Sequence, residues 1–348
     1  MSNETIGDRA KSYDPEVKQV ESRSVSAEKL VEMYTTMLRI RKFEEKIVDL
    51  VVAKGVRLGL AHLYIGEEAV ATGVCANLRK DDYIISTHRG HGHCIAKGTQ
   101  PKYMMAELFG KKTGTNKGKG GSMHIAQVAL GNLGANGIVA AGIPHAVGAG
   151  LSIKIRGTDQ VSVSFFGDGA TNQGVFHEAL NIAAILSLPV IFVCENNMYA
   201  IGTAIAYAAR VQNLAERAAA YGIPGVTLNG MDVVAVYEAA RDAVARARQG
   251  RGPTLLECKT YRYKGHSGPY DREAYGTPYR TEDEVATWKR QDPIPSFLRR
   301  LLGGGVLTPD QVGRIEAAVV AEIEDAVTFA IESPDPAPED ALEDLFAE

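Results

Sequence analysis

Apolar side chains recur at three- and four-residue steps near the start of the chain. The repeat covers residues 30–51, which predicts one long amphipathic helix. Ser26 is a suitable N-cap for this helix, and Gly55 is a suitable end. The segment before it, residues 1–26, is mostly polar, and we expect it to be a flexible tail.

Short apolar runs alternate with helical patterns in the middle of the chain. The runs at 161–166 (VSVSFF) and 189–195 (PVIFVCE) are rich in β-branched and aromatic residues and predict buried strands. Residues 171–188 between them predict a helix, so the three segments form a βαβ unit. A helix that ends at Gly250 and a strand within 252–263 continue the alternation. This order is typical of a mostly parallel sheet with helices on both faces.

The same pattern predicts the domain organisation. Residues 27–332 contain no linker and no internal repeat, so we expect one α/β domain with N-terminal and C-terminal helical arms. The C-terminal arm is the helix predicted at 308–332. Residues 333–348 are acidic, and we expect this tail to be loosely held.

Composition narrows the class of protein. The chain has 348 residues, of which 45% are hydrophobic and 23% charged, as in globular rather than disordered proteins. Its net charge of −4 disfavours nucleic-acid binding, which needs a basic surface. The most apolar stretch, 138–153, is interrupted by Pro144 and His145 and is too short to span a membrane. No signal peptide is evident, and the four scattered cysteines favour a reducing cytoplasm over a disulfide framework.

Candidate chemistry follows two of the predicted strands. The first strand runs into Gly-Asp-Gly at 167–169, and the second ends at Glu-Asn-Asn, 195–197. The carboxyl ends of parallel strands share one edge of a sheet, where ligands bind. A carboxylate from Asp168, an amide oxygen from Asn197 and a backbone carbonyl, completed by phosphate oxygens, would suit Mg²⁺. The glycines would let a diphosphate approach, and a helix starting near Thr171 would present free amides to it.

Other interpretations of these residues stay open at this point. Gly-Asp-Gly alone could be a plain strand-to-helix turn. A nicotinamide-binding fingerprint needs a third glycine at a spacing that Gly174 does not meet, and no Walker motif is present. The crowded residues His88, His91, His93 and Cys94 could suggest zinc, although such ligands rarely all come from one short run. The glycine- and lysine-rich run 114–121 could be a phosphate cradle or a flexible loop near a subunit interface.

Seven sequence blocks, in order, resemble the α subunit of the thiamine-dependent 2-oxo acid dehydrogenases, and the pyruvate and acetoin branch in particular. The resemblance spans roughly residues 27–330. The blocks are AHLYIGEEA (61–69), STHRGHGHCIAKG (86–98), GKGGSMHI (118–125), GANGIVAAGIP (134–144), GDGATNQG (167–174), ENNMYAIGT (195–203) and TYRYKGHS (260–267). The resemblance implies a thiamine-diphosphate-binding fold.

The resemblance also implies which residues hold magnesium and thiamine diphosphate. Asp168, Asn197 and the backbone carbonyl of Tyr199 match the family's metal ligands. The backbones of Gly137 and Val139 match positions that hold the aminopyrimidine ring. The residues that match contacts to the diphosphate are Arg89, His88, Gly169, Ala170 and His266.

Two histidines match active-site positions of the family. The resemblance assigns His266 to the diphosphate and to proton or acyl handling, and His62 to orienting the substrate or an incoming lipoyl group. Imidazole suits both tasks, because its ordinary pKa lies near neutrality.

The family also implies partners. A glutamate that activates the pyrimidine comes from a second, similar domain, and we find neither its residues nor the length for it. We therefore expect a β subunit carrying that glutamate, in an α₂β₂ heterotetramer, and a lipoyl-bearing dihydrolipoyl acyltransferase as acceptor. The implied reaction is oxidative decarboxylation of pyruvate with acetyl transfer to the lipoyl group. Acetoin cleavage by the same carbanion chemistry is the close alternative, and a non-catalytic assembly subunit is an alternative of another class.

We expect the loop 268–281 to become ordered only with the cofactor or the acyl-carrier partner. Ser267, just before this loop, aligns with a phosphorylated serine of the mitochondrial forms.

Overall fold

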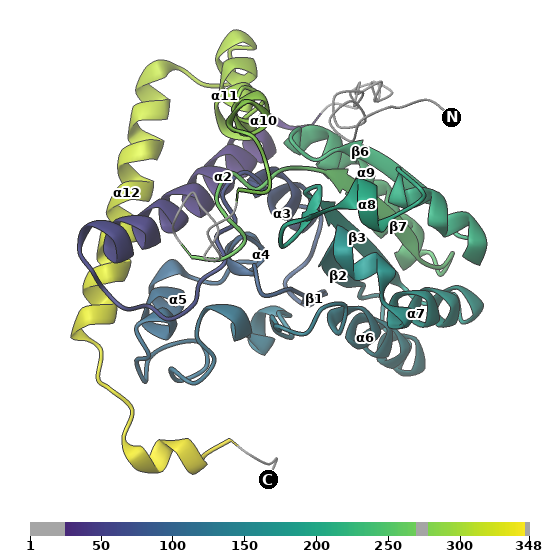
Figure 1. Ribbon diagram of the computed structural model, residues 1–348, viewed down its shortest axis with the longest axis horizontal. Coiled ribbons are helices and arrows are strands. Elements are labelled where there is room, and N and C mark those ends of the chain that lie inside the picture. Colours follow the sequence, from purple (N-terminus) through teal and green to yellow (C-terminus); the bar gives the residue numbers. More distant parts are fainter. Residues whose placement is uncertain (1–24, 269–277, 345–348) are drawn as a thin grey trace.

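A computed structural model describes residues 25–268 and 278–344 of the chain (Figure 1). The predicted tail 1–26 therefore lies almost entirely outside the described residues, as does most of the loop 268–281. Every structural statement below refers to the described residues.

Five parallel strands form the central sheet, in the order β1-β2-β3-β7-β6. A separate antiparallel pair, β4 and β5, follows β3 in the chain. The strands are β1 (Tyr83–Ile85), β2 (Ser162–Gly167), β3 (Val190–Asn196), β4 (Tyr199–Ala200), β5 (Thr203–Ala204), β6 (Gly225–Asn229) and β7 (Thr254–Lys259). The predicted strands at 161–166, 189–195 and within 252–263 are confirmed as β2, β3 and β7.

Side chains that alternate along the strands pack into two separate cores. Phe166 and Phe192 face the core under helices α6 (Gly142–Arg156) and α7 (Gly174–Ile185). Phe165 faces the opposite core, which α3 and α9 cover. The sheet therefore lies between two helical layers (Figure 1), and the prediction of an α/β fold with helices on both faces is confirmed.

Two long helices pack beside this sheet domain as the predicted arms (Figure 1). The Ser26 side chain accepts a hydrogen bond from the backbone amide of Lys29, which caps α2 as predicted. Helix α12 begins after a Thr308 capping box and packs on α5 and α2. The α-helices not yet given bounds are α2 (Ala27–Val48), α3 (Glu68–Cys75), α4 (His91–Ala96), α5 (Pro101–Leu108), α8 (Ile205–Ala208), α9 (Val233–Arg248), α10 (Glu282–Lys289), α11 (Pro293–Gly303) and α12 (Pro309–Glu332).

The acidic C-terminal segment differs from its prediction, because residues 333–344 lie against the lysine-rich loop rather than being loosely held. Lys111 pairs with Asp335 at 2.7 Å, and Lys112 pairs with Asp340 at 2.8 Å. The lysines of these pairs lie close in sequence to helix α5, so the tail is anchored to the body by charge. The pair with the exposed Asp335 contributes about 0–1 kcal/mol, whereas the Asp340 side chain is buried and holds the segment in place.

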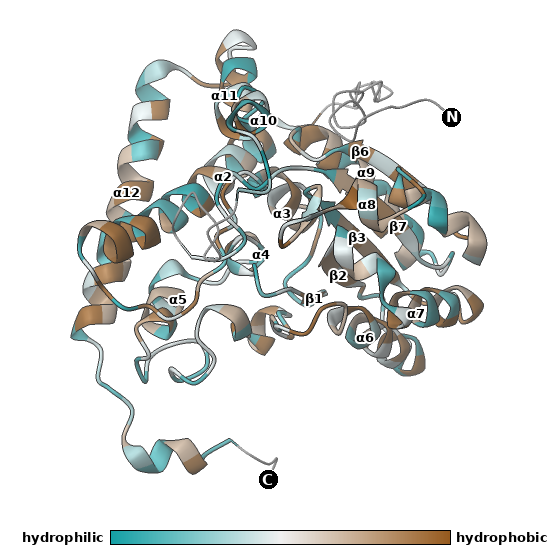
Figure 2. Cartoon of the chain, in the orientation of Figure 1, coloured by the Kyte–Doolittle hydropathy of each residue, from teal (hydrophilic) through white to brown (hydrophobic). Residues whose placement is uncertain are grey.

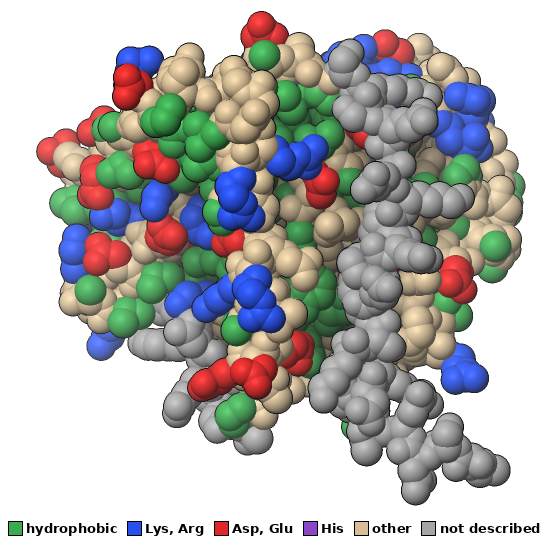
Figure 3. All heavy atoms as spheres, turned by 90° about the horizontal axis from the view of Figure 1, so that it is seen from above, with side chains coloured by type: hydrophobic (Ala, Val, Ile, Leu, Met, Phe, Trp, Pro, Cys, Tyr) green, Lys and Arg blue, Asp and Glu red, His purple; other side chains and the backbone are tan. Residues whose placement is uncertain are grey.

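The surface carries two features that bear on partners. On the face drawn in Figure 3, acidic and basic side chains are interspersed, and no continuous basic surface appears there. Ile155 on α6 and Ile185 on α7 are 76% and 71% exposed, and Leu151 and Ile182 beside them are also exposed, so brown apolar positions lie on both helices in Figure 2.

Among the described helices none is long and apolar enough to cross a membrane. The four cysteines are free and buried.

Candidate active site

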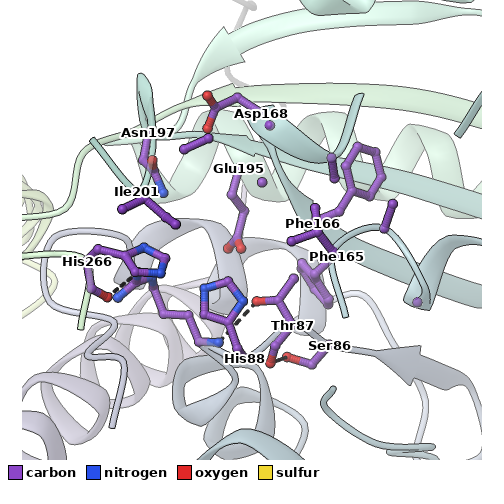
Figure 4. A pocket seen from close by; sticks show the side chains of 18 of the residues that line it. Ser86, Thr87, His88, Phe165, Phe166, Asp168, Glu195, Asn197, Ile201 and His266 are labelled. Atoms are coloured by element: carbon purple, nitrogen blue, oxygen red, sulfur yellow. Dashed lines mark hydrogen bonds between the residues drawn. The ribbon is translucent and has the colours of Figure 1, made fainter. Parts of the chain in front are cut away.

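A cavity of about 310 Å³ opens at the carboxyl ends of β2 and β3. Nearly all the residues predicted for the site meet in it. The predicted residues that line it are His88, Arg89, Val139, Asp168, Gly169, Ala170, Asn197, Tyr199 and His266. Gly137 stands between the lining residues Asn136 and Ile138 without lining the cavity itself, and His62 lies behind His88 and His266. In Figure 4, Asp168 and Asn197 lie on one side of the cavity and His88 and His266 on the other.

The register of β2 on β3 brings the two polar motifs together. Gly167 is paired with Glu195, so Asp168 and Asn197 follow neighbouring strand ends as predicted. Asp168 is only 2% exposed, burial raises its pKa to about 6, and its Oδ2 atom has no hydrogen-bond partner among the described residues. An unpaired carboxylate in such a place is costly. A cation bound here would remove that cost.

Asn197 and the Tyr199 carbonyl, the other two predicted metal ligands, are held by residues from other parts of the chain. The Asn197 amide nitrogen donates to Glu67 Oε1 at 3.0 Å, which leaves its oxygen near the backbone amide of Tyr199, at 3.4 Å. The Tyr199 carbonyl accepts from Arg262 Nη2 at 3.1 Å. These oxygens, together with Asp168, form the oxygen-rich set that Mg²⁺ prefers.

The helix predicted to start near Thr171 or Asn172 begins two to three residues later. Residues 168–172 form a single 3₁₀ segment, and α7 begins at Gly174. A side chain at Gly169 would place its Cβ 2.6 Å from the Cβ of Ala200, so the 3₁₀ segment and the turn after β3 touch at a glycine. The cavity is therefore bordered by a tight backbone turn and by Gln173, the N-cap residue of α7.

Two buried guanidinium groups flank the cavity. Arg89 donates to the carbonyls of Leu63 at 2.7 Å and His266 at 2.9 Å. Burial and the neighbouring Arg262 lower the pKa of Arg89 to about 10. The sequence analysis missed Arg262, which lies in the TYRYKGHS block beside the predicted His266. Two confined cations at the mouth of a cavity favour an anionic ligand such as a diphosphate.

Three imidazole rings meet beside these arginines. The ring centroids of His62 and His88 are 4.6 Å apart, and His266 lies 5.0 Å from the first and 5.3 Å from the second. Burial is the main reason why all three histidines have a lowered pKa, and the nearby charge of Arg89 is the second. The pKa is about 3 for His62, about 2 for His88 and about 3 for His266. The rings are therefore neutral near pH 7 and able to accept or donate hydrogen bonds. One nitrogen of each ring lies within 4.8 Å of the others.

The other residues of the crowded histidine run do not join His88. His93 on α4 is buried and contacts Glu195 at 2.9 Å and the Ser86 hydroxyl at 2.7 Å. His91 contacts Glu44 at 3.1 Å and Ser122 at 2.9 Å. Separate partners for each ring exclude the zinc interpretation of this run, and these two histidines support the cavity from behind.

The backbone amides of the glycine- and lysine-rich run 114–121 bind a carboxylate of the chain itself. These amides point at the carboxylate of Glu107, which is buried on α5. The donors are Asn116 at 2.7 Å, Gly118 at 2.9 Å, Gly120 at 2.7 Å and Gly121 at 3.0 Å. Because the chain's own carboxylate fills the cradle, neither the phosphate-cradle nor the flexible-loop interpretation holds.

Comparison with known proteins places this chain in a family. The family described as the dehydrogenase E1 component matches residues 35–339. The α subunit of acetoin:2,6-dichlorophenolindophenol oxidoreductase from Bacillus subtilis is 51% identical over 94% of this chain and 96% of its own length. The subunit of the same name from Cupriavidus necator is 47% identical over 92% of this chain and 94% of its own length.

A pyruvate dehydrogenase E1 component subunit alpha, from Porphyra purpurea, is 41% identical over 93% of this chain and 95% of its own length. The resemblance stated from the sequence is thereby confirmed. The chain belongs to the dehydrogenase E1 component family, as an α-subunit-type member.

Proposed function

We propose that the chain is the α subunit of a thiamine-diphosphate- and Mg²⁺-dependent dehydrogenase that cleaves acetoin or decarboxylates a 2-oxo acid. The observation that carries the proposal is the buried carboxylate of Asp168. Its Oδ2 atom has no hydrogen-bond partner among the described residues, and it lies at a strand end with Asn197 in a cavity that two buried arginines also line. A metal ion with a bound diphosphate would compensate all of these charges together.

The donor set fits this cofactor. Asp168, Asn197 and the Tyr199 carbonyl would hold Mg²⁺, since all three offer hard oxygen ligands. The residues that would hold the diphosphate are Arg89, His88, Gly169, Ala170 and His266. The backbones of Gly137 and Val139, which are placed at the rim, would support the aminopyrimidine ring.

When bound, thiamine diphosphate supplies a carbanion that adds to a carbonyl group and then accepts the electrons of the broken bond. The chain's own part is to bind, orient and move protons. His62 and His266 are neutral near pH 7 and can accept or donate hydrogen bonds. Besides burial, the charges of Arg89 and Arg262 help to lower both pKa values, and a bound diphosphate would offset these charges and so favour the proton transfer that the resemblance implies. Phe165 and Phe166 line the opposite wall of the cavity and keep it apolar.

The substrate is the finer part of the proposal. The sequence analysis placed pyruvate first and acetoin second. The two relatives named for acetoin are 51% and 47% identical, against 41% for the relative named for pyruvate, so we now place acetoin first. The non-catalytic alternative is disfavoured because the candidate metal and diphosphate residues are all present and line one cavity, with His62 directly behind it.

A partner subunit completes the proposal. Ile138 and Val139 at the cavity rim are 75% and 53% exposed, although the resemblance assigns Val139 to the cofactor. A β subunit that brings the activating glutamate would cover them, and a lipoyl-bearing acyltransferase would accept the acyl group. We propose an α₂β₂ arrangement on the resemblance alone.

The test is turnover by the chain together with its β subunit. Acetoin and pyruvate are supplied separately, with 2,6-dichlorophenolindophenol as electron acceptor, with and without Mg²⁺ and thiamine diphosphate. We expect activity that needs both subunits and both cofactors, and its loss in Asp168→Asn. Equal activity of the α chain alone, or of the pair without thiamine diphosphate, would overturn the proposal.

A further inference from the structure

Glu67 is a buried carboxylate that the site described so far does not explain. It is 1% exposed, it stands directly before helix α3, and it lines the cavity. The positive end of the helix dipole favours a negative charge at this place. One of its oxygens, Oε2, has no hydrogen-bond partner among the described residues. Carboxylates are not kept buried at this cost unless something nearby uses their charge or geometry.

One oxygen of Glu67 fixes the Asn197 side chain. The Asn197 amide nitrogen lies 3.0 Å from Oε1 of Glu67. Burial and the nearby Glu195 raise the pKa of Glu67 to about 7, while Arg89 and the hydrogen bond from Asn197 favour its ionised form. That form can only accept hydrogen bonds, so it draws the amide nitrogen of Asn197 toward Glu67. The amide oxygen then points the other way and accepts a hydrogen bond from the Tyr199 backbone amide, 3.4 Å away. This is the orientation that a metal ligand needs.

The other oxygen of Glu67 faces Arg89. The Arg89 Nε atom lies 3.5 Å from Oε2, and both groups are almost fully buried. The two Nη atoms of Arg89 are held by the carbonyls of Leu63 and His266. The guanidinium is therefore gripped on three sides, and Glu67 provides the charged side. Without that charge, two buried arginines would repel each other across the cavity.

We infer that Glu67 is a positioning residue that aims Asn197 and Arg89 together, so that the metal and the diphosphate are bound as one unit. The inference rests on the proposed function, because it presumes that these two residues bind metal and diphosphate. A purely structural role would require only that Glu67 stabilise the fold. A positioning role requires that its removal act through Asn197 and Arg89.

The experiment measures binding of thiamine diphosphate to the reconstituted subunit pair by calorimetry, at saturating Mg²⁺, and then the Mg²⁺ dependence at saturating thiamine diphosphate. Glu67→Gln keeps the size but places an amide nitrogen against one of its two partners. We expect cofactor affinity to fall about 10- to 100-fold, as for other residues that orient metal ligands. In turnover, the KM for the cofactor should rise more than kcat falls. Glu238→Gln is the matched control, because Glu238 is another buried glutamate, on α9, with an unpartnered oxygen among the described residues.

Double variants separate positioning from plain stability. In an Asn197→Ala background, Glu67→Gln should cause little further loss of Mg²⁺ affinity, because the group that it aims is gone. Glu67→Asp is the second variant, for the case that Glu67→Gln does not fold. This variant keeps the charge near Arg89 but withdraws the carboxylate from Asn197. The affinity for Mg²⁺ should therefore fall, while the diphosphate should still bind.

Each outcome has one meaning. Affinity within twofold of the wild type for Glu67→Gln overturns the inference while leaving the proposed function intact. Fully additive losses in Glu67→Gln/Asn197→Ala, or equal losses in Glu238→Gln, also overturn it. If the wild-type pair binds no thiamine diphosphate at all, the proposed function fails, and the inference fails with it.

Discussion

The hydroxyl of Tyr199 donates a hydrogen bond to the carboxylate of Glu284, 2.9 Å away, and so ties the turn after β3 to helix α10. Tyr261 donates to the same carboxylate at 2.7 Å. Met198 and Ile201, on either side of this turn, have φ angles of +74° and +54°, which non-glycine residues rarely adopt. Such backbone persists only where surrounding contacts over-determine it.

The first prediction concerns this tie. Glu284→Ala should lower the free energy of unfolding by about 1–3 kcal/mol, because it leaves two tyrosine hydroxyls without their acceptor. It should also weaken cofactor binding, because the Tyr199 carbonyl belongs to the same turn. Urea unfolding and calorimetry measure the two effects. Glu282→Ala, two residues away and exposed, is the control and should change neither. A Glu284→Ala variant with unchanged cofactor affinity would show that the turn holds its shape without the tie.

The second prediction uses a pair of glycines. Gly169→Ala places a methyl group 2.6 Å from the Cβ of Ala200, so the 3₁₀ segment and the metal-binding turn must move apart. We expect cofactor binding to be lost while most of the fold stays intact. Gly174→Ala adds the same methyl group where no atom lies within 4 Å, and should be neutral or slightly stabilising. Similar binding by both variants would contradict the contact.

The third prediction is a pH dependence. Burial holds the pKa of His62 near 3, below the ordinary value of about 6.5 that applies in the unfolded chain. As the pH falls below about 6.5, the unfolded state takes up a proton that the folded state refuses. Stability is therefore lost on acidification, by at most about 1.4 kcal/mol per pH unit for one histidine.

The raised pKa of Asp168 acts in the opposite direction, because the folded state binds its proton more readily, so the net slope of the wild type mixes both groups. A difference between variants isolates the histidine. His62→Gln should show a smaller loss of stability between pH 7 and pH 5 than the wild type, measured by urea unfolding. Parallel curves for the two proteins would contradict the assignment.

The fourth prediction concerns the cradle around Glu107. Glu107→Gln replaces one acceptor oxygen by a donor that faces backbone amides, which should cost about 1–3 kcal/mol of stability. The run 114–121 should then be cut more readily by trypsin at its lysines. Glu45→Gln, on the exposed side of α2, should change stability by less than about 0.5 kcal/mol. Unaltered cleavage in Glu107→Gln would mean that the loop is held by other contacts.

Strands that their own residues reveal could be predicted from the sequence, and strands that depend on a neighbour could not. The strands β2 and β3 could be predicted because both are rich in β-branched and aromatic residues, and both are buried along nearly their whole length. Strand β1 was missed because it has three residues, and β6 because it is a largely polar edge strand. Local pattern decides the central strands, while only pairing with a neighbour makes an edge segment a strand.

The candidate site divides in the same way. Asp168 and Asn197 could be brought together from the rule that parallel strands end at one edge. The roles of Glu67 and Glu284 could not, because their contacts with Asn197 and Tyr199 join positions 130 and 85 residues apart in sequence. The short 3₁₀ segment before α7 was also hidden, since its sequence is compatible with a helix start.

The apolar side chains exposed on α6 and α7 have a consequence for the production of this protein. Ile155 and Ile185 are left in water when the chain is made alone, and exposed apolar patches promote aggregation. We expect the partner subunit proposed above to cover these residues too, so the yield of chain that stays in solution should follow the supply of that partner, with the excess found in inclusion bodies. The two polypeptides would then have to be made in equal amounts, because each copy of the partner covers one copy of this apolar surface. A bicistronic transcript is the simplest means to achieve this.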